Sequence, residues 1–92
     1  MNPTIENQML YIKEDDKMIA YLTFPIVREN VVNINHTYVH PSKRGLGLAK
    51  ILMDHLYDYL KENNLKATAT CSYADAYFKK NKDKQDVLYE GE

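Results

Sequence analysis

The stretch VHPSKRGLGLA, residues 39–49, decides the fold, because two of the three glycines of the chain fall inside it, between a segment with strand character and a segment with helical periodicity. Glycine permits positive φ and lets a ligand approach the backbone closely. The first N–H groups of a helix have no internal partner, and the helix dipole adds partial positive charge there. With Lys43 and Arg44 beside Gly45 and Gly47, this turn is predicted to bind a phosphate or pyrophosphate.

Two common phosphate motifs do not fit this turn. A P-loop would need the pattern G-x-x-x-x-G-K-[ST], which the chain lacks. The dinucleotide fingerprint would need glycine or alanine where Lys50 stands. A glycine-bearing turn with surface charges and no ligand is the alternative interpretation.

The hydrophobic periods on either side of the turn predict a mixed fold. Apolar residues recur every three or four positions after the turn, which is typical of an amphipathic helix. Short β-rich runs stand before it, and another follows the helix. A strand–helix–strand crossover of this kind favours two parallel strands. We therefore expect an α/β fold (mixed α+β) with a mixed antiparallel and parallel sheet, one long helix and one short helix. The expected strands are Met9–Glu14, Met18–Phe24, Val31–Val39, Lys66–Cys71 and Val87–Tyr89, and the expected helices are Leu46–Asn63 and Ala74–Asn81.

Composition limits the class of protein. The 92 residues are expected to form one domain, residues 1–92. A net charge of −1 argues against a protein that coats nucleic acid or binds a membrane surface. The sequence has no apolar run of membrane-spanning length and no signal-peptide pattern, and its single cysteine fits a reducing compartment, so we expect a cytoplasmic protein. The histidines, the cysteine and the acidic residues show no metal-ligand spacing, so no metal is expected.

The turn also carries a resemblance to a known family. Arg44-x-x-Gly47-x-Ala49 resembles the [Q/R]-x-x-G-x-[G/A] signature of the GNAT superfamily of acyl-CoA-dependent N-acetyltransferases. The preceding TYVHP, residues 37–41, resembles the strand end and V-x-P of that family, and the following LAKILM, residues 48–53, resembles its helix. This resemblance implies a GNAT-like fold and acetyl-CoA or coenzyme A as the cofactor.

The resemblance also implies a set of cofactor-binding residues. In the family, the strand before the signature splays from the next parallel strand, and the pantetheine arm lies in the gap. Tyr77 is a candidate for the tyrosine that protonates the leaving thiolate, although the family spacing would place Phe78 there. Lys80 stands in a lysine-rich run that could meet the 3′-phosphate or simply form a solvated helix end. The implied residues are Thr37, Tyr38, Val39, Lys43, Arg44, Gly45, Leu46, Gly47, Leu48, Ala49, Tyr77 and Lys80.

The chain departs from full-length members of the family in its N-terminal half. Full GNAT domains carry two helices there that wall the acceptor site, whereas Met18–Phe24 runs into Val31 with no room for them. The chain therefore resembles the small members of the superfamily, with an open acceptor side.

His36 and Cys71 are the candidate catalytic residues. We expect them near the C-terminal ends of two neighbouring parallel strands, where open α/β sheets bind ligands. Histidine could accept the proton of the amine. Cysteine paired with histidine could become a thiolate and carry the acetyl group transiently. Small GNAT proteins resemble this chain in having a histidine and a cysteine in these regions. A half-buried structural histidine and a small buried hydrophobe are the alternatives.

The leading hypothesis is an acetyl-CoA-binding N-acetyltransferase that acts on an amine, either of a small molecule or of a protein lysine or N-terminus. Direct transfer and an acetyl-cysteine intermediate both fit these residues. One alternative is a non-catalytic CoA- or acyl-CoA-binding module that acts through a protein partner. Another is an interaction domain whose glycine turn binds only adventitious anions. We expect no nucleic-acid or membrane partner, and either a monomer or a homodimer.

Overall fold

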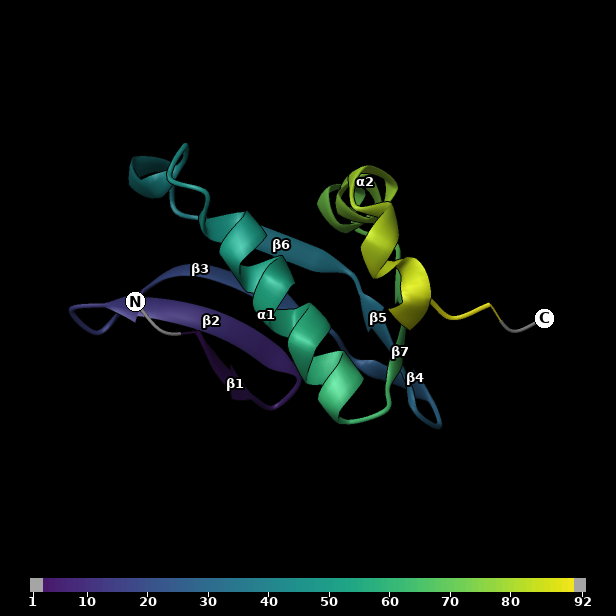
Figure 1. Cartoon of the computed structure of the whole chain (residues 1–92). Helices are drawn as coiled ribbons and strands as arrows, with labels where there is room; N and C mark the ends of the chain where they lie inside the picture. The colour runs from purple at the N-terminus through teal and green to yellow at the C-terminus, as the bar shows by residue number, and fades with distance from the viewer. Residues whose placement is uncertain (1–2, 91–92) are drawn as a thin grey trace.

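The computed structural model describes residues 3–90 and has the predicted mixed α+β fold (Figure 1). The expected long helix and short helix are both present. Each strand and helix begins and ends as follows: β1 (Thr4–Glu6), β2 (Met9–Glu14), β3 (Lys17–Thr23), β4 (Ile26–Arg28), β5 (Val31–Ile34), β6 (His36–Val39), the 3-10 turn η1 (Pro41–Lys43), α1 (Leu48–Glu62), β7 (Lys66–Ala69), α2 (Ser72–Lys80) and the 3-10 turn η2 (Lys82–Val87).

The strands form two sheets rather than one. One sheet has the order β1-β2-β3-β6 and is antiparallel throughout, and the other has the order β4-β5-β7. In the second sheet β5 and β7 are parallel, with Val32 opposite Ala67. The crossover predicted from the sequence is therefore confirmed, with α1 as its connecting helix.

The prediction of one continuous strand over residues 31–39 is wrong at Asn35. Ile34 pairs with Ala69 in one sheet, whereas His36 pairs with Thr23 in the other, so the chain changes sheets between them. The Ile34 carbonyl accepts the N–H groups of both Thr70 and Cys71 at 3.1 Å. The parallel ladder ends at these two hydrogen bonds to one carbonyl. Beyond them, β6 and the chain after β7 have no backbone pairing with each other in the described residues.

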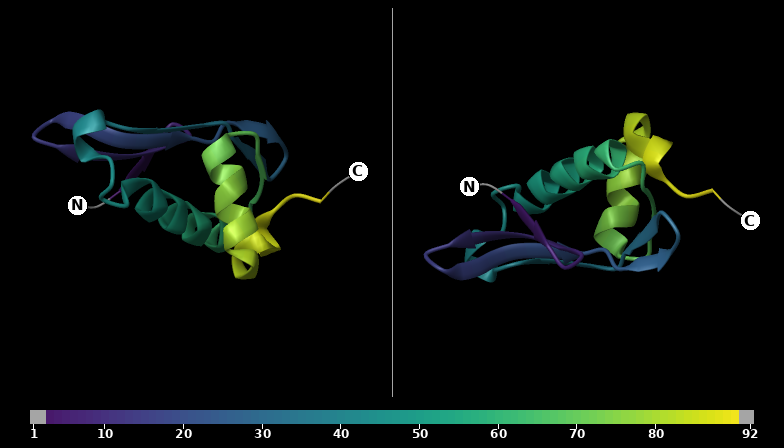
Figure 2. Two further views of the ribbon diagram at one scale, coloured as in Figure 1. Left: turned by 90° about the horizontal axis from the view of Figure 1, so that it is seen from above. Right: turned by 90° about the horizontal axis from the view of Figure 1, so that it is seen from below.

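Both helices lie on one side of the strands, and no helix within residues 3–90 covers the other side (Figure 2). The buried stripe of α1 packs on fully buried sheet residues such as Leu10 and Leu22. Complete burial of each such leucine is worth about 1.5–3 kcal/mol. The helix is shorter than predicted at both ends, because Gly47 caps it with φ 77° and Asn63 caps it at the other end. The stripe consists of Leu48, Leu52, Met53, Leu56 and Leu60.

Three smaller corrections concern short elements. The last strand predicted at residues 87–89 is instead the end of η2 followed by a single parallel bridge between Leu88 and Ala67. Asp86 accepts hydrogen bonds from Tyr57 and Lys61 of α1, and these bonds hold the segment in a turn. Strands β1 and β4 were not expected, since each has three residues and little apolar periodicity. None of the helices in the described range is both long and apolar enough to cross a membrane.

Candidate functional site

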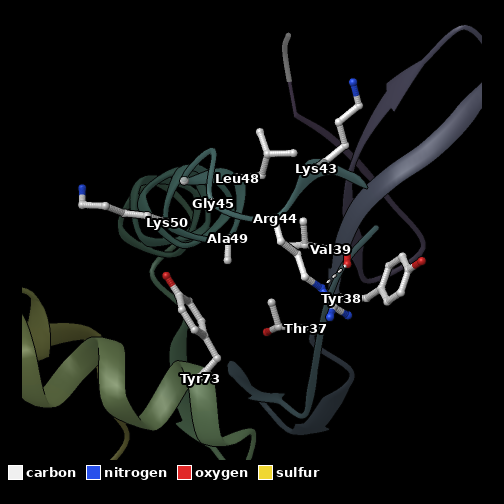
Figure 3. A pocket seen from close by; sticks show the side chains of 11 residues that line it. Thr37, Tyr38, Val39, Lys43, Arg44, Gly45, Leu48, Ala49, Lys50 and Tyr73 are labelled. Carbon is white, nitrogen blue, oxygen red and sulfur yellow. Dashed lines mark hydrogen bonds between the residues drawn. The ribbon is translucent and has the colours of Figure 1, made fainter. Parts of the chain in front are cut away.

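A hollow of about 430 Å³ opens where β6 separates from the β5–β7 pair. The end of β6 forms one wall, the turn before α1 and the first turn of α1 form another, and the start of α2 forms the third (Figure 3). The lining residues are Thr37, Tyr38, Val39, Lys43, Arg44, Gly45, Gly47, Leu48, Ala49, Lys50 and Tyr73.

Strand β6 presents an unpaired backbone edge to this hollow. The N–H of His40 donates to the Ile19 carbonyl of β3 at 2.7 Å. Backbone groups of alternate residues in a strand point to opposite sides. The backbone groups of Thr37 and Val39 therefore point away from β3, and the Val39 carbonyl accepts a bond from Arg44 Nε at 3.2 Å (Figure 3).

The turn before α1 has the geometry of an anion site. Gly45 and Gly47 have φ of 85° and 77°, in the left-handed region that glycine adopts most easily. The first helical bond of α1 is from Ile51 N–H to the Gly47 carbonyl at 3.1 Å, so the three preceding N–H groups are outside the helical ladder. No acidic side chain lies in the first turn of α1 to satisfy these groups. Lys43 is held at 2.7 Å from Glu14 of the β2–β3 hairpin.

Three of the predicted cofactor residues lie outside this hollow. Leu46 is 60% exposed on the turn. Tyr77 and Lys80 line a second, smaller hollow of about 170 Å³ between α1 and α2. Lys50 and Tyr73 line both hollows, and neither residue was predicted from the sequence to bind the cofactor. Tyr73 was missed because the short helix was expected to begin at Ala74, whereas α2 begins at Ser72.

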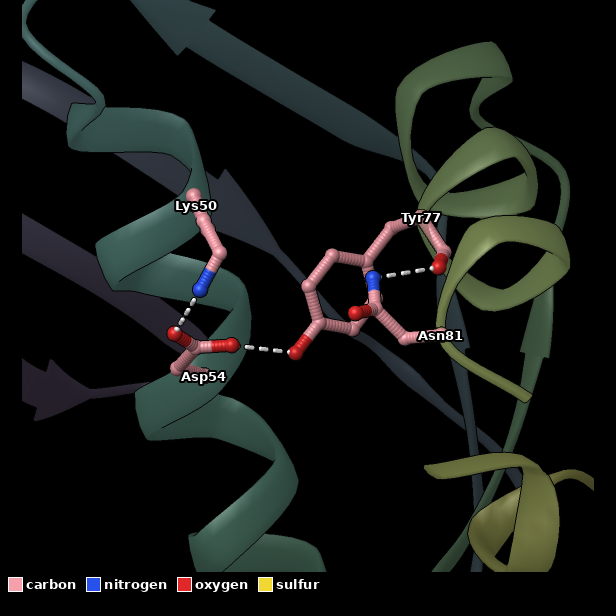
Figure 4. A network of polar contacts seen from close by, with 4 residues as sticks. All are labelled: Lys50, Asp54, Tyr77 and Asn81. Carbon is pink, nitrogen blue, oxygen red and sulfur yellow. Dashed lines mark hydrogen bonds and ion pairs between the residues drawn. The ribbon is translucent and has the colours of Figure 1, made fainter. Parts of the chain in front are cut away.

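Tyr77 is buried and committed to a structural bond. Its phenol donates to the Asp54 carboxylate of α1, and the other Asp54 oxygen lies 2.7 Å from Lys50 Nζ (Figure 4). Burial, followed by the bond to Asp54, raises the pKa of Tyr77 well above its ordinary value of 10.0. Tyr77 therefore joins the two helices, and its proton is held by Asp54.

Cys71 lies at the N-cap of α2, half-buried, beside β6. Its Sγ is 3.3 Å from Oγ1 of Thr37. Burial raises the pKa of the thiol, but hydrogen bonds from Thr37 and from the backbone of Ala74 and Tyr73 lower it, and together they outweigh burial. The net effect is a pKa below the ordinary value of 9.0, which favours the reactive thiolate.

His36 lies apart from this thiol. It stands two residues after the end of β5, which is parallel to β7, so its expected position near the end of a parallel strand is confirmed. The chain changes sheets at Asn35, however, and His36 is the first residue of β6, which pairs with β3. The His36 ring is exposed and lies 5.6 Å from the ring of Tyr21, on the face of β6 opposite Thr37. Among the described side chains, the hydrogen-bond partner of Cys71 is Thr37.

Comparison with known proteins identifies the family. A family model described as GCN5-related N-acetyl-transferase matches residues 9–87. The chain belongs to the GCN5-related N-acetyltransferase family. Human NATD1 is 39% identical to the chain over 62 residues, which cover 67% of the chain and 55% of NATD1. The chain thus matches little more than half the length of this relative.

Solved structures show the same fold. A GCN5-like protein from Staphylococcus aureus, solved by NMR, is 30% identical with a TM-score of 0.74, over 99% of this chain and 90% of that one. The PaiA N-acetyltransferase of Thermoplasma acidophilum, solved in complex with coenzyme A, is 17% identical with a TM-score of 0.62, over 79% of this chain and 48% of that one. The predicted resemblance to the small GNAT proteins is confirmed for this GCN5-related N-acetyltransferase family member.

Proposed function

We propose that this chain binds acetyl-CoA in the hollow between β6 and α1 and transfers the acetyl group to an amine. The observation that carries the proposal is that one hollow combines a helix N-terminus preceded by left-handed glycines with a strand edge that has no partner strand in the described residues. Such a pair suits a ligand with phosphates at one end and an amide-bearing arm at the other. That the PaiA N-acetyltransferase, a protein with the same fold, was solved with coenzyme A supports the assignment.

The phosphate end of the ligand suits the turn of residues 43–49. Backbone N–H groups of Gly45, Gly47, Leu48 and Ala49 would hold the pyrophosphate, and the helix dipole adds to their attraction. Lys43 and Arg44 supply two full positive charges beside them. Because Arg44 already bonds the Val39 carbonyl across the hollow, its guanidinium is within reach of both walls.

The arm suits the edge of β6. The Thr37 carbonyl and the Val39 N–H are the backbone groups with which amides of the arm can pair as a neighbouring strand would, because the Val39 carbonyl accepts from Arg44 and the Thr37 backbone bonds the Cys71 sulfur. Cys71 lies beside the same edge, because its Sγ contacts the Thr37 hydroxyl. The end of the arm is therefore expected beside the thiol and the start of α2.

Acetyl-CoA would supply the acetyl group as an activated thioester. Acetylation of an amine forms a C–N bond, breaks the C–S bond and releases one proton from the amine. His36 is exposed, and histidine is a side chain that commonly acts as a general base, so it is the candidate base for that proton. Backbone N–H groups of β6 are candidate donors to the developing oxyanion. Since Asp54 holds the proton of Tyr77, the phenol that lines the hollow, Tyr73, is the better-placed proton donor for the departing thiolate.

Cys71 offers a second route, in which its thiolate takes the acetyl group and passes it to the amine. A non-catalytic CoA-binding module is the alternative function. The lack of a helix over the outer face of the sheets within residues 3–90 favours that alternative, because no element there walls an acceptor site. Acetylation of any amine by the purified protein would exclude it.

A thermal shift with acetyl-CoA, CoA and 3′-dephospho-CoA tests the binding site. Ala49→Glu places a carboxylate in the first turn of α1, where an acidic residue stabilises a helix but repels a phosphate. His55→Glu, at an exposed position on the same helix, is the control. We expect acetyl-CoA to stabilise the wild type and His55→Glu and to leave Ala49→Glu unchanged. No stabilisation of the wild type at millimolar ligand would rule out the proposal.

A further inference from the structure

A cluster of neutral polar side chains lies where the two sheets part. Oδ1 of Asn33 accepts from the hydroxyl of Thr68 at 2.9 Å and from that of Thr70 at 3.2 Å. Oδ1 of Asn35 accepts from the hydroxyl of Thr23. Threonine hydroxyls therefore fix both amides by their oxygen atoms, and the two Nδ2 groups have no hydrogen-bond partner in residues 3–90.

The cluster faces away from the helices. Val32, Ile34 and Ala67 point into the core, so their strand neighbours Asn33 and Thr68 point to the opposite face. No helix in the described part of the chain covers that face (Figure 2). Asn33 and Thr68 are half-buried, whereas Asn35 and Thr70 are exposed, so the amide donors are accessible to a ligand.

The same cluster is adjacent to the proposed reaction site. Thr70 precedes Cys71 directly, and Asn35 is two residues from Thr37, whose Cα is therefore within about 7 Å of its own. Cys71 and Thr37 are in contact at 3.3 Å. An acceptor that enters from the open face would pass the two amides before it reaches the thiol and the strand edge.

We propose that the Nδ2 groups of Asn33 and Asn35 bind a carbonyl oxygen of the acceptor, which is the N-terminus of a peptide. This inference rests on the proposed function and names its substrate class. The short path from the amides to Cys71 suits an acceptor whose carbonyl stands close to its amine, as in an α-amino amide. A lysine side chain separates the two groups by a longer flexible chain.

The charge of the cluster distinguishes a peptide from a free amino acid. None of its five members is charged: Asn33, Asn35, Thr23, Thr68 and Thr70. A free amino acid would bring a carboxylate, which proteins recognise best with arginine or lysine. A neutral peptide carbonyl is satisfied by neutral amide donors, so the cluster favours the peptide.

Asn35→Asp is the decisive variant. It keeps an oxygen for the Thr23 hydroxyl but replaces the donor with a second acceptor, which repels a carbonyl and attracts an alkylammonium. Asn7→Asp makes the same chemical change in an exposed turn and serves as the control. The acceptors are trialanine amide, alanine and n-propylamine, compared at equal concentration of free base in the presence of acetyl-CoA.

For the wild type and Asn7→Asp we expect the lowest KM with trialanine amide. Asn35→Asp should raise that KM about three- to tenfold, the loss of one hydrogen bond, while the KM of n-propylamine stays constant or falls. Affinity for CoA and the melting temperature should not change. Equal KM values for trialanine amide and n-propylamine in the wild type, or equal effects of Asn35→Asp on both, would refute the inference.

A binding measurement keeps the inference testable if no acetyl is transferred. In the CoA-loaded protein, trialanine amide should shift the side-chain NH₂ resonances of Asn33 and Asn35, and n-propylamine should not. Those shifts without turnover would support the peptide site and contradict the transferase proposal. Turnover without those shifts would support the transferase and contradict the peptide site.

Discussion

The phenol of Tyr77 on α2 is bonded to the carboxylate of Asp54 on α1, and this bond ties the two helices together behind the proposed cofactor site. Tyr77 is 5% exposed, and Lys50 holds the second oxygen of Asp54. A tyrosine that the family resemblance suggested as a proton donor is thereby part of the framework of the fold.

Replacement of Tyr77 by phenylalanine tests that structural role. Tyr77→Phe should lower the free energy of unfolding by about 1–2 kcal/mol, because a bond to a charged group is lost and the ring is kept. Tyr73→Phe, on the more exposed face of the same helix, should cost less than about 0.5 kcal/mol. Urea denaturation measures both. A larger loss of stability for Tyr73→Phe than for Tyr77→Phe would contradict the assignment.

The same carboxylate predicts a pH dependence of stability. Burial raises the pKa of Asp54, but the hydrogen bonds from Lys50 and Tyr77 lower it by more than burial raises it. The net pKa is therefore below the ordinary value of 3.8. A carboxylate with a depressed folded pKa contributes stability above its unfolded pKa and loses it as the pH falls through the folded value. Between about pH 4 and pH 2 the free energy of unfolding should fall less steeply for Asp54→Asn than for the wild type. Urea denaturation at a series of pH values measures this. If the free energy of unfolding fell equally steeply for both proteins, Asp54 would not contribute to the pH dependence.

The thiol of Cys71 should ionise at a lower pH than an ordinary cysteine thiol. The pH profile of its alkylation by iodoacetamide should have a midpoint below the ordinary thiol pKa of 9.0. Thr37→Val should move that midpoint upward, because the hydroxyl that stabilises the thiolate is removed. His36→Ala should leave it in place. A shift with His36→Ala and none with Thr37→Val would reverse the two roles.

The left-handed glycines set the cost of changing the phosphate turn. A Cβ at Gly45 or Gly47 would meet no atom within 4 Å, so the cost of alanine is that of backbone strain alone. Each substitution should lower the free energy of unfolding by about 1 kcal/mol. Asn64, which follows α1, has φ 55° and allows the opposite substitution. Asn64→Gly should raise the free energy of unfolding by a few tenths of a kcal/mol, because glycine adopts this backbone conformation more easily. If chemical denaturation showed no loss of stability for either alanine variant, the turn would have changed its backbone conformation to accommodate alanine.

The ion pair between Lys43 and Glu14 should compete with the cofactor. Glu14→Gln frees the ammonium for the pyrophosphate, so CoA should bind about two- to threefold more tightly at low ionic strength, and the gain should vanish at high salt. Asp16→Asn removes the same charge from an exposed position in the same turn. Calorimetric titration distinguishes them, and an equal gain from both variants would mean that only net charge matters.

The sequence was sufficient to predict the features with a strong local signal. The leucine period of α1, the glycine turn and the parallel crossover are all present as expected. The break at Asn35 was not predictable, because residues 31–39 have continuous β character, and only the pairing partners on each side reveal the change of sheet.

The predictions for the site follow the same division. Residues adjacent to the signature motif line the hollow, because their position follows from the backbone of one turn. Tyr73 and Tyr77 lie four residues apart on one helix, and only the position of Asp54 on α1 separates the structural phenol from the one that lines the hollow. Contacts between helices of this kind leave no pattern in a single sequence.

The change of sheet at Asn35 also constrains the length of the chain. One residue inserted into β6 would turn the backbone of Thr37 and Val39 toward β3 and would remove the unpaired edge, even though every side chain were kept. The β2–β3 turn, which is exposed, carries no such constraint. Insertions and deletions should therefore be tolerated at that turn and excluded from residues 35–39, where the spacing of the residues matters as much as their identity.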